Sequence, residues 1–307
     1  MSEDALRGLL GSTGRMLPHA SYPGGALDTL TGRTVATVFF ENSTRTRGSF
    51  ALAAQRLGAG VVDFSNANST VKGESLADTV RTVSAMGVDA IVVRSSRAGA
   101  SACAAPATEV PVLNGGDGCH EHPTQGLLDA FTLCEAMGRL DGFDLSGVRV
   151  AIVGDVLHSR VARSAAAALQ TLGATVELVG PGPLVPESMR AILNEHGAIE
   201  RDLDAAVERA DAVMMLRVQF ERGAAVASTY RERYALTRER AQRLREGAVM
   251  LHPGPMNLGV EIDAEVADGS GLPSGRRSLV LRQVAVGVAV RMAALEWCVQ
   301  GAGACRR

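Results

Sequence analysis

A cluster of hydroxyl and guanidinium side chains follows an apolar segment near the N-terminus of the chain. The segment covers residues 34–40, and the cluster after it reads Glu41-Asn42-Ser43-Thr44-Arg45-Thr46-Arg47. Residues 49–57 read as a helix, so Ser43 lies near a helix start, where unpaired N–H groups and the helix dipole favour an anion. Arg45 can add a charge-assisted bond to phosphate oxygens. The cluster predicts a phosphate site; a serine cap with two solvated arginines is the alternative for this segment alone.

Strand-like and helix-like segments alternate along the chain, which is typical of parallel sheets with crossover helices. A polar, glycine-containing stretch at residues 138–142 divides them into two series. The first has predicted strands at 34–40, 61–64, 89–93 and 110–113 and helices at 47–57, 74–86 and 124–137. The second has strands at 148–153, 175–179, 212–216 and 248–251 and helices at 160–172, 187–195 and 238–245. We expect an α/β fold of two doubly wound parallel-sheet domains, residues 1–138 and 139–278, with residues 279–307 packing back on the first domain.

The composition is that of a globular protein with two cores. The chain has 307 residues, 46% hydrophobic and 21% charged, with a net charge of −2, which argues against a nucleic-acid-binding surface. The apolar stretch 279–299 is broken by polar residues, so we expect a packed helix and no membrane span. No signal peptide is recognised, and a cytoplasmic location is expected. Five cysteines without CxxC spacing indicate neither a zinc site nor a disulfide framework.

The turn after predicted strand 148–153 does not carry a dinucleotide-binding motif. It reads Gly154-Asp155-Val156-Leu157-His158-Ser159-Arg160, which lacks the three glycines of G-x-G-x-x-G. Arg160 instead starts a predicted helix near the carboxyl ends of the strands, where open α/β sheets bind ligands. A second anion-binding arginine is therefore expected there, and no nucleotide cofactor.

Six short motifs occur in one order along nearly the whole chain: residues 39–47, Lys72-Gly73-Glu74, His122-Pro123-Thr124-Gln125, residues 154–160, Leu216-Arg217-Val218-Gln219, and His252-Pro253-Gly254-Pro255-Met256-Asn257. In the identity and order of these motifs, the chain resembles the aspartate and ornithine carbamoyltransferase family. The aspartate branch is favoured, because residues 252–255 lack the cysteine-containing motif of the ornithine branch. The resemblance implies an N-terminal carbamoyl-phosphate domain, a C-terminal amino-acid domain, and transfer of a carbamoyl group to an amine in pyrimidine biosynthesis.

The resemblance also implies roles for residues of the first motifs. The phosphate of carbamoyl phosphate would be bound by Ser43, Thr44, Arg45 and Thr46. Thr46, Arg94 and His122 would donate to the carbonyl oxygen, which gains negative charge as the amine attacks. Gln125 would bind the carbamoyl NH2 group, and Pro253 belongs to the same carbamoyl-phosphate site.

The amino-acid site would lie in the second half of the chain. Arg160 would bind one carboxylate of the acceptor and Arg217 the other, since a guanidinium matches a carboxylate in two parallel bonds. Gln219, Gly254 and Pro255 would complete this site, with Arg222 helping to lock the closing loop. Lys72 would come from a loop that crosses into a neighbouring subunit, which implies a homotrimer with shared active sites.

The implied reaction requires no metal and no organic cofactor. The neutral amine attacks the carbamoyl carbon, phosphate leaves, and the leaving phosphate can accept the amine proton. Juxtaposing the two anionic substrates and closing the domains over them would supply much of the rate gain. The sequence leaves open whether regulatory or partner enzyme subunits join the trimer.

Five positions depart from the family pattern, and they leave the acceptor open. Leu258 stands where arginine is expected, Ser95 where histidine commonly follows Arg94, Asn68 and Ser69 shift a serine pattern, and Val286 replaces a polar residue. A leucine beside the amino-acid site weakens attraction for a second carboxylate. Besides an aspartate enzyme, the alternatives are a paralogous carbamoyltransferase for a different amine or diamino acid, and an inactive scaffold subunit.

Overall fold

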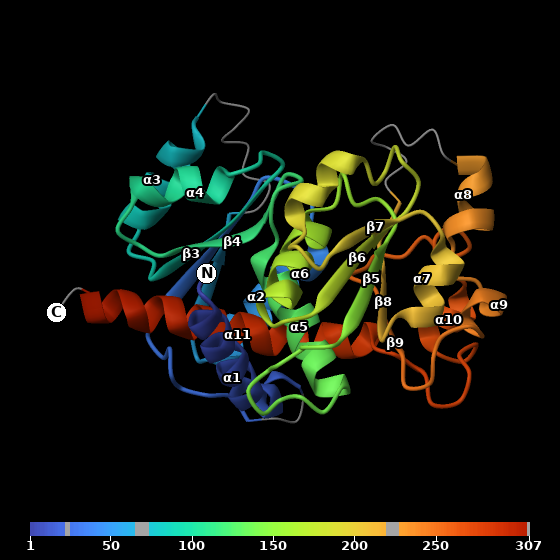
Figure 1. Ribbon diagram of the computed structural model, residues 1–307. Coiled ribbons are helices and arrows are strands. Elements are labelled where there is room, and N and C mark those ends of the chain that lie inside the picture. The colour runs from blue at the N-terminus through green and yellow to red at the C-terminus, as the bar shows by residue number, and fades with distance from the viewer. Residues whose placement is uncertain (22–24, 65–73, 219–226, 306–307) are drawn as a thin grey trace. The chain divides into compact units, whose positions relative to one another are not determined.

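The computed structural model describes residues 1–21, 25–64, 74–218 and 227–305 (Figure 1). Lys72, Asn68, Gln219 and Arg222 lie outside the described residues. Contacts divide the chain into two compact units: unit 1 is Met1–Thr124 with Ala285–Arg307, and unit 2 is Gln125–Val284. The sequence predicts this boundary at residue 138. The assignment of carbamoyl phosphate to the first domain and of the amino acid to the second stays a prediction.

Unit 1 is built on a parallel sheet with strand order β2-β1-β3-β4. Its elements are α1 (Glu3–Ala20), β1 (Thr34–Phe39), α2 (Thr44–Arg56), β2 (Gly60–Asp63), α3 (Leu76–Ala85), β3 (Ala90–Ser95), α4 (Ala100–Ala104), the 3-10 turn η2 (Ala105–Ala107) and β4 (Val112–Asp117). All six residues of β3 are buried, as expected for a central strand covered on both faces.

Parallel pairing brings polar residues from distant segments to one edge of the unit 1 sheet. β1 and β3 run in register, with Phe39 beside Arg94 at their carboxyl ends. The chain leaves β1 there and enters α2 at Thr44 after only four residues, 40–43. The start of α2 and the side chain of Arg94 therefore lie at the same end of the sheet.

Unit 2 is built on a six-stranded parallel sheet with order β10-β9-β8-β5-β6-β7 (Figure 1). Its strands are β5 (Arg149–Val153), β6 (Thr175–Val179), β7 (Ala198–Glu200), β8 (Ala212–Met215), β9 (Val249–Leu251) and β10 (Arg277–Ser278). Its helices are α5 (Pro123–Ala136, in this unit from Gln125), α6 (Arg160–Thr171), η3 (Glu187–Ile192), α7 (Leu203–Arg209), α8 (Ala227–Tyr234), α9 (Arg238–Ala241), α10 (Ala264–Asp268) and the start of α11 (Val280–Cys305).

The predicted strands and most predicted helices are present, but two helices were predicted wrongly. The segment predicted as a helix at 187–195 is the 3-10 turn η3, which follows Pro186 and stops at Ile192. The helix predicted at 238–245 is reduced to α9, because Arg243 and Leu244 already make i→i+3 bonds to Arg240 and Ala241. Strands β7 and β10 are too short for an alternating pattern to reveal them.

Helix α11 was predicted to pack as a core helix. Residues 280–301 have the length and composition of a membrane span, but 61% of the most apolar window is buried inside the protein. Two buried polar side chains lie on the helix, Gln283 and Arg291. The guanidinium of Arg291 lies 5.3 Å from the ring centroid of Phe50, within unit 1. Buried, partnered polar groups of this kind are typical of a helix that packs on protein.

Candidate active site

The start of α2 offers an anion site at the end of β1. Ser43 is the N-cap residue, yet its side chain makes no capping hydrogen bond, and the first turn of α2 carries no acidic residue. Thr44 and Arg45 are exposed. The hydroxyl of Ser43 and the first N–H groups of the helix are thus placed to bind an anion. The predicted helix start is confirmed, and the phosphate role stays a prediction.

Arg94 is held at this end of the sheet by three acceptors. Its Nε donates to Glu41 Oε1 at 2.7 Å, and its Nη1 donates to Thr46 Oγ1 and to the carbonyl oxygen of Gly115, each at 3.1 Å. The residue is only 8% exposed. These contacts fix the plane of the guanidinium, so its remaining donors have a set direction.

His122 shares the hydroxyl of Thr46 with Arg94. Its Nε2 lies 3.4 Å from Thr46 Oγ1, and the ring is buried. The structure therefore brings together Thr46, Arg94 and His122 from α2, β3 and the turn before α5. Hydroxyl, guanidinium and imidazole groups that converge in this way form a donor cluster for a carbonyl or phosphoryl oxygen.

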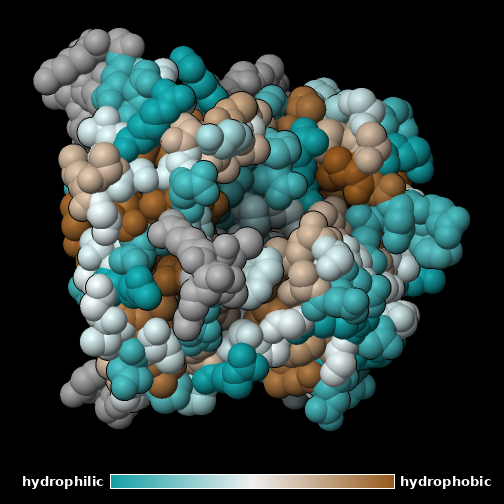
Figure 2. Space-filling view, turned by 90° about the vertical axis from the view of Figure 1, so that its left-hand side faces the viewer, coloured by the Kyte–Doolittle hydropathy of each residue, from teal (hydrophilic) through white to brown (hydrophobic). Residues whose placement is uncertain are grey.

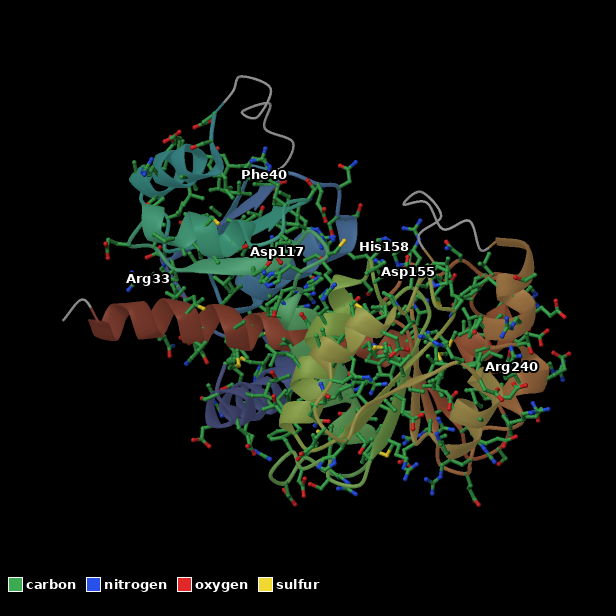
Figure 3. The ribbon with its side chains drawn as sticks, turned by 45° about the horizontal axis from the view of Figure 1, so that its top comes forward. Arg33, Phe40, Asp117, Asp155, His158 and Arg240 are labelled. Atoms are coloured by element: carbon green, nitrogen blue, oxygen red, sulfur yellow. The ribbon has the colours of Figure 1, made fainter. Side chains whose placement is uncertain are left out.

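Asp117 organises the two loops beside this cluster (Figure 3). Its Oδ2 accepts a bond from the N–H of Gly99 at 2.7 Å, and its Oδ1 accepts one from the N–H of Glu121 at 2.9 Å. Gly99 belongs to the loop after β3, and Glu121 directly precedes His122. Sequence reasoning did not single out Asp117, although an acidic residue between two glycines after a strand is a turn signal.

The turn after β5 in unit 2 presents Arg160. Gly154 has a φ of +124°, and a Cβ there would lie 3.1 Å from the hydroxyl oxygen of Tyr230, so this position requires glycine. Asp155 is buried and its Oδ1 lies 2.8 Å from Nδ1 of His158 (Figure 3). Ser159 caps α6 and places Arg160 at its first position.

The pKa of Tyr230 is raised, mainly by burial and further by the negative charges of Glu261 and Asp155. The hydroxyl group of Tyr230 therefore stays protonated.

Arg217 lies just after β8 and contacts the loop after β9. Its Nε donates to Asn257 Oδ1 at 3.4 Å, while Asn257 Nδ2 donates to the carbonyl oxygen of Val218 at 3.0 Å. The backbone N–H of Asn257 donates in turn to the buried carboxylate of Glu261. The loop residue Asn257 thus orients an arginine predicted to bind a carboxylate.

The loop at residues 252–255 and the side chain of Gln125 each make polar contacts inside unit 2. The Nδ1 of His252 accepts a bond from the N–H of Gly254 at 2.8 Å, and His252 Nε2 lies 3.4 Å from Glu261 Oε1. Gln125 is buried, and its Nε2 donates to Asp129 at 2.9 Å. Asp129 carried no motif signal, because its role depends on packing between helices.

The predicted residues are divided between the two units. Unit 1 holds Ser43, Thr44, Arg45, Thr46, Arg94 and His122, and unit 2 holds Gln125, Arg160, Arg217, Pro253, Gly254 and Pro255. Three of the positions that depart from the family pattern lie within the described residues. Leu258 is 53% exposed, whereas Ser95 and Val286 are buried.

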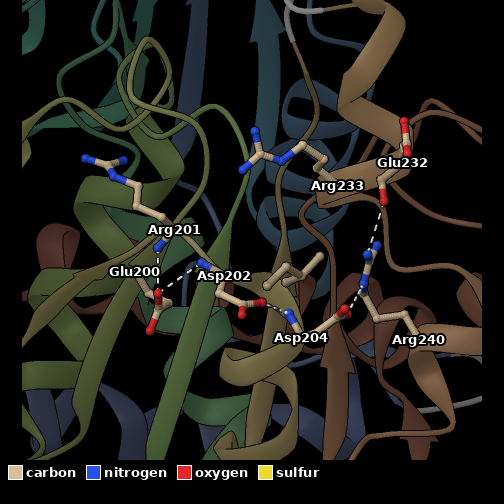
Figure 4. Close-up of a pocket in the computed structure, with 8 residues that line it drawn as sticks. Glu200, Arg201, Asp202, Asp204, Glu232, Arg233 and Arg240 are labelled. Carbon is tan, nitrogen blue, oxygen red and sulfur yellow. Dashed lines mark hydrogen bonds and ion pairs between the residues drawn. The ribbon is translucent and has the colours of Figure 1, made fainter.

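A pocket in unit 2 lies around α7 and α9, and none of the predicted site residues that the structure describes lines it. Two of its lining residues, Arg240 and Asp204, form an ion pair (Figure 4). The surface face seen in Figure 2 shows only scattered hydrophobic patches between hydrophilic residues. In the described ranges, no group of three or more His, Cys, Asp or Glu residues is arranged to hold a metal ion.

Comparison with known proteins decides the family. Residues 1–135 match the carbamoyl-phosphate-binding domain of aspartate/ornithine carbamoyltransferases, and residues 146–298 match their Asp/Orn-binding domain. The chain belongs to the aspartate/ornithine carbamoyltransferase family. The family inferred from the six motifs is therefore confirmed.

Two similar relatives of this carbamoyltransferase carry the same name. The aspartate carbamoyltransferase catalytic subunit of Salinispora tropica is 51% identical over 280 residues, covering 90% of this chain and 87% of that relative. The subunit of the same name from Parafrankia sp. is 49% identical over 307 residues, covering 98% and 94%. An aspartate carbamoyltransferase-family enzyme is thus indicated over the full length of the chain.

Solved structures agree in fold. The catalytic subunit of M. Jannaschii aspartate transcarbamoylase superposes with a TM-score of 0.81 at 32% identity, covering 98% of this carbamoyltransferase and 96% of that chain. Aspartate transcarbamoylase from Trypanosoma cruzi, in complex with carbamoyl aspartate and phosphate, gives a TM-score of 0.80 at 30% identity, covering 96% and 92%. The predicted class of two parallel-sheet α/β domains is confirmed.

Proposed function

We propose that this chain transfers the carbamoyl group of carbamoyl phosphate to the α-amine of L-aspartate, giving N-carbamoyl-L-aspartate and phosphate. The observation that carries the proposal is the donor cluster of Thr46, Arg94 and His122 beside the start of α2. It joins an anion site to three groups that can stabilise a carbonyl oxygen. The solved relative from Trypanosoma cruzi has been crystallised with carbamoyl phosphate and aspartate, which are the two substrates of this reaction.

The donor substrate is bound through its phosphate and its carbonyl oxygen. Ser43, Thr44, Arg45 and Thr46 bind the phosphate at the helix start. Thr46, Arg94 and His122 donate to the carbonyl oxygen, Gln125 binds the carbamoyl NH2 group, and Pro253 belongs to the same site. Because the geometry of Arg94 is set by Glu41 and Gly115, its donors need little reorganisation as negative charge develops.

The acceptor substrate is a dicarboxylate amine. Arg160 and Arg217 bind its two carboxylates, Gly254 and Pro255 shape the site, and Lys72 and Gln219 complete it. The amine nitrogen forms a bond to the carbamoyl carbon while the bond from that carbon to the phosphate oxygen breaks. The proton lost by the amine passes to the leaving phosphate, so no side chain is needed as a general base.

The protein acts as a cytoplasmic homotrimer in pyrimidine biosynthesis, with Lys72 supplied to each site by a neighbouring subunit. Leu52 on α2 and Val62 on the edge strand β2 are 49% and 42% exposed, and β2 directly precedes the segment that contains Lys72. An edge strand and exposed apolar side chains suit contact with another copy. The relatives are named catalytic subunits, which is consistent with further regulatory or partner subunits.

Colorimetric detection of ureido product tests the proposal. Purified protein is incubated with carbamoyl phosphate and aspartate, and then with a panel of other amino acids and diamines. Turnover with aspartate supports the proposal. Turnover only with another amine identifies a paralogous carbamoyltransferase, and no turnover by folded protein that also fails to bind carbamoyl phosphate contradicts it.

A further inference from the structure

A buried chain of hydrogen bonds within unit 2 links α5 to the start of α11 and to the loop after β9. Gln125 Nε2 and Gln283 Nε2 both donate to Oδ1 of Asp129, at 2.9 Å and 2.7 Å. The Oε1 of Gln283 accepts the backbone N–H of His252 at 2.9 Å. Asp129 is 0% exposed, Gln283 3% and Gln125 8%, so these groups are shielded from bulk water.

These hydrogen bonds can run in only one direction, from donor to acceptor. A backbone N–H can only donate, so Gln283 must turn its carbonyl oxygen towards His252 and its NH2 group towards Asp129. Asp129 Oδ1 accepts the NH2 group of Gln283, and it accepts the NH2 group of Gln125 as well. The orientation of both amides, which are otherwise easily interchanged, is therefore set by their partners.

This orientation leaves the carbonyl oxygen of Gln125 as the group available to a ligand. Among the described residues no hydrogen bond reaches Gln125 Oε1, although the residue is almost fully buried. An acceptor oxygen on a residue that is nearly buried favours a ligand that brings an N–H donor.

We propose that Asp129 is a positioning residue that makes the site selective for an acyl donor bearing an NH2 group over the same donor bearing a methyl group. The inference rests on the proposed function, in which Gln125 binds the carbamoyl NH2 group. Asp129 holds the Gln125 amide with its oxygen outward, and Gln283 braces Asp129 from α11. A methyl group at the same place cannot pair with that oxygen and leaves it desolvated and unsatisfied.

Two stable phosphonates of nearly the same shape test the inference. Phosphonoacetamide carries the NH2 group, and 2-oxopropylphosphonate carries a methyl group in its place. Calorimetry on the full-length protein gives both dissociation constants, and their ratio does not depend on the fraction of folded protein. We expect the wild-type protein to bind the amide at least about tenfold more tightly.

Three substitutions at Asp129 and one control separate positioning from a structural role. Asp129→Leu and Asp129→Ala remove the acceptor, and the preference for the amide should fall at least fivefold. Asp129→Asn keeps one acceptor oxygen and should retain most of the preference. The control is Glu135→Gln, because Glu135 also ties α5 to α11 through Arg282, at 2.6 Å, without contacting Gln125. Its preference should equal that of the wild-type protein.

Three outcomes would overturn the inference. The first is a wild-type protein that binds both phosphonates equally. The second is a folded Asp129→Ala or Asp129→Leu protein that keeps the wild-type preference. The third is a Glu135→Gln protein that loses the preference to the same extent as the Asp129 variants. Failure of the proposed function is a separate result, since it is read from ureido formation with carbamoyl phosphate.

Discussion

Arg94 Nη1 lies 3.1 Å from Thr46 Oγ1, and the same hydroxyl lies 3.4 Å from Nε2 of His122. One threonine on the first turn of α2 thereby joins a guanidinium from β3 to an imidazole that precedes α5. The three groups are 48 and 76 residues apart from Thr46 in sequence, yet they form a single donor cluster.

Replacing Arg94 by lysine should lower kcat/KM about 100-fold or more, because the charge is kept but the fork that reaches Glu41, Thr46 and Gly115 is lost. Steady-state kinetics with carbamoyl phosphate and aspartate measure the effect. Arg97→Lys is the control, since Arg97 is exposed on the loop after β3 and should keep wild-type kinetics. Equal activity of Arg94→Lys and wild-type protein would exclude a role for the guanidinium plane.

Asn257→Ala should raise the KM for aspartate about tenfold, because Arg217 loses the acceptor that orients its Nε. The dissociation constant for a carbamoyl-phosphate analogue such as phosphonoacetamide should change less than twofold. Saturation kinetics in aspartate and calorimetry with the phosphonate measure the two effects separately. A parallel loss of affinity for both ligands would point to a general disturbance of unit 2.

Gly126→Ala should destabilise the protein by about 1–3 kcal/mol, because a Cβ at this position would lie 2.4 Å from the backbone carbonyl oxygen of Ser164 on α6. Thermal unfolding or urea titration measures the change. Gly11→Ala in α1 is the matched control: its Cβ meets no atom within 4 Å, so the helix should gain about 0.5–1 kcal/mol. If Gly126→Ala left the free energy of unfolding unchanged, α5 and α6 would be able to move apart without loss of stability.

Burial raises the pKa of the Cys298 thiol to about 11. At pH 8 only roughly one thiol in a thousand is then the reactive thiolate, so iodoacetamide should label Cys298 far more slowly than the exposed Cys103. The rate at Cys298 should rise about tenfold per pH unit up to pH 10, since the thiolate fraction rises by that factor. Mass spectrometry of peptides after timed labelling measures both sites in one sample, and equal rates at pH 8 would contradict the prediction.

Lys72→Ala and Arg45→Ala proteins should each be nearly inactive, whereas mixed trimers of the two should regain activity. In a mixed trimer, a site with Arg45 from one subunit and Lys72 from its neighbour is intact. Activity is measured after the two variants are denatured and refolded together, with each variant refolded alone as the control. Absence of recovery in a trimer confirmed by light scattering would refute shared active sites.

Local sequence patterns were sufficient for the strand-to-helix transition at the first motif. An apolar β-rich segment, a serine and a helical pattern determine where β1 ends and α2 begins, because these preferences act over a few residues. The same reasoning placed Arg160 at the start of α6. The parallel arrangement of both sheets could be predicted from the alternation of strands and helices, since two parallel strands need a crossover connection.

The tertiary structure alone decided which polar groups meet. The sequence itself indicated the family and most helix starts, and it predicted which residues could hold an anion. It did not reveal that Asp129 is shared by Gln125 and by Gln283, which is 154 positions away from Asp129. Nor did it reveal that Asp117 joins the loops after β3 and before His122. Such pairs depend on how whole helices and strands pack, and no propensity that acts over neighbouring residues carries that information.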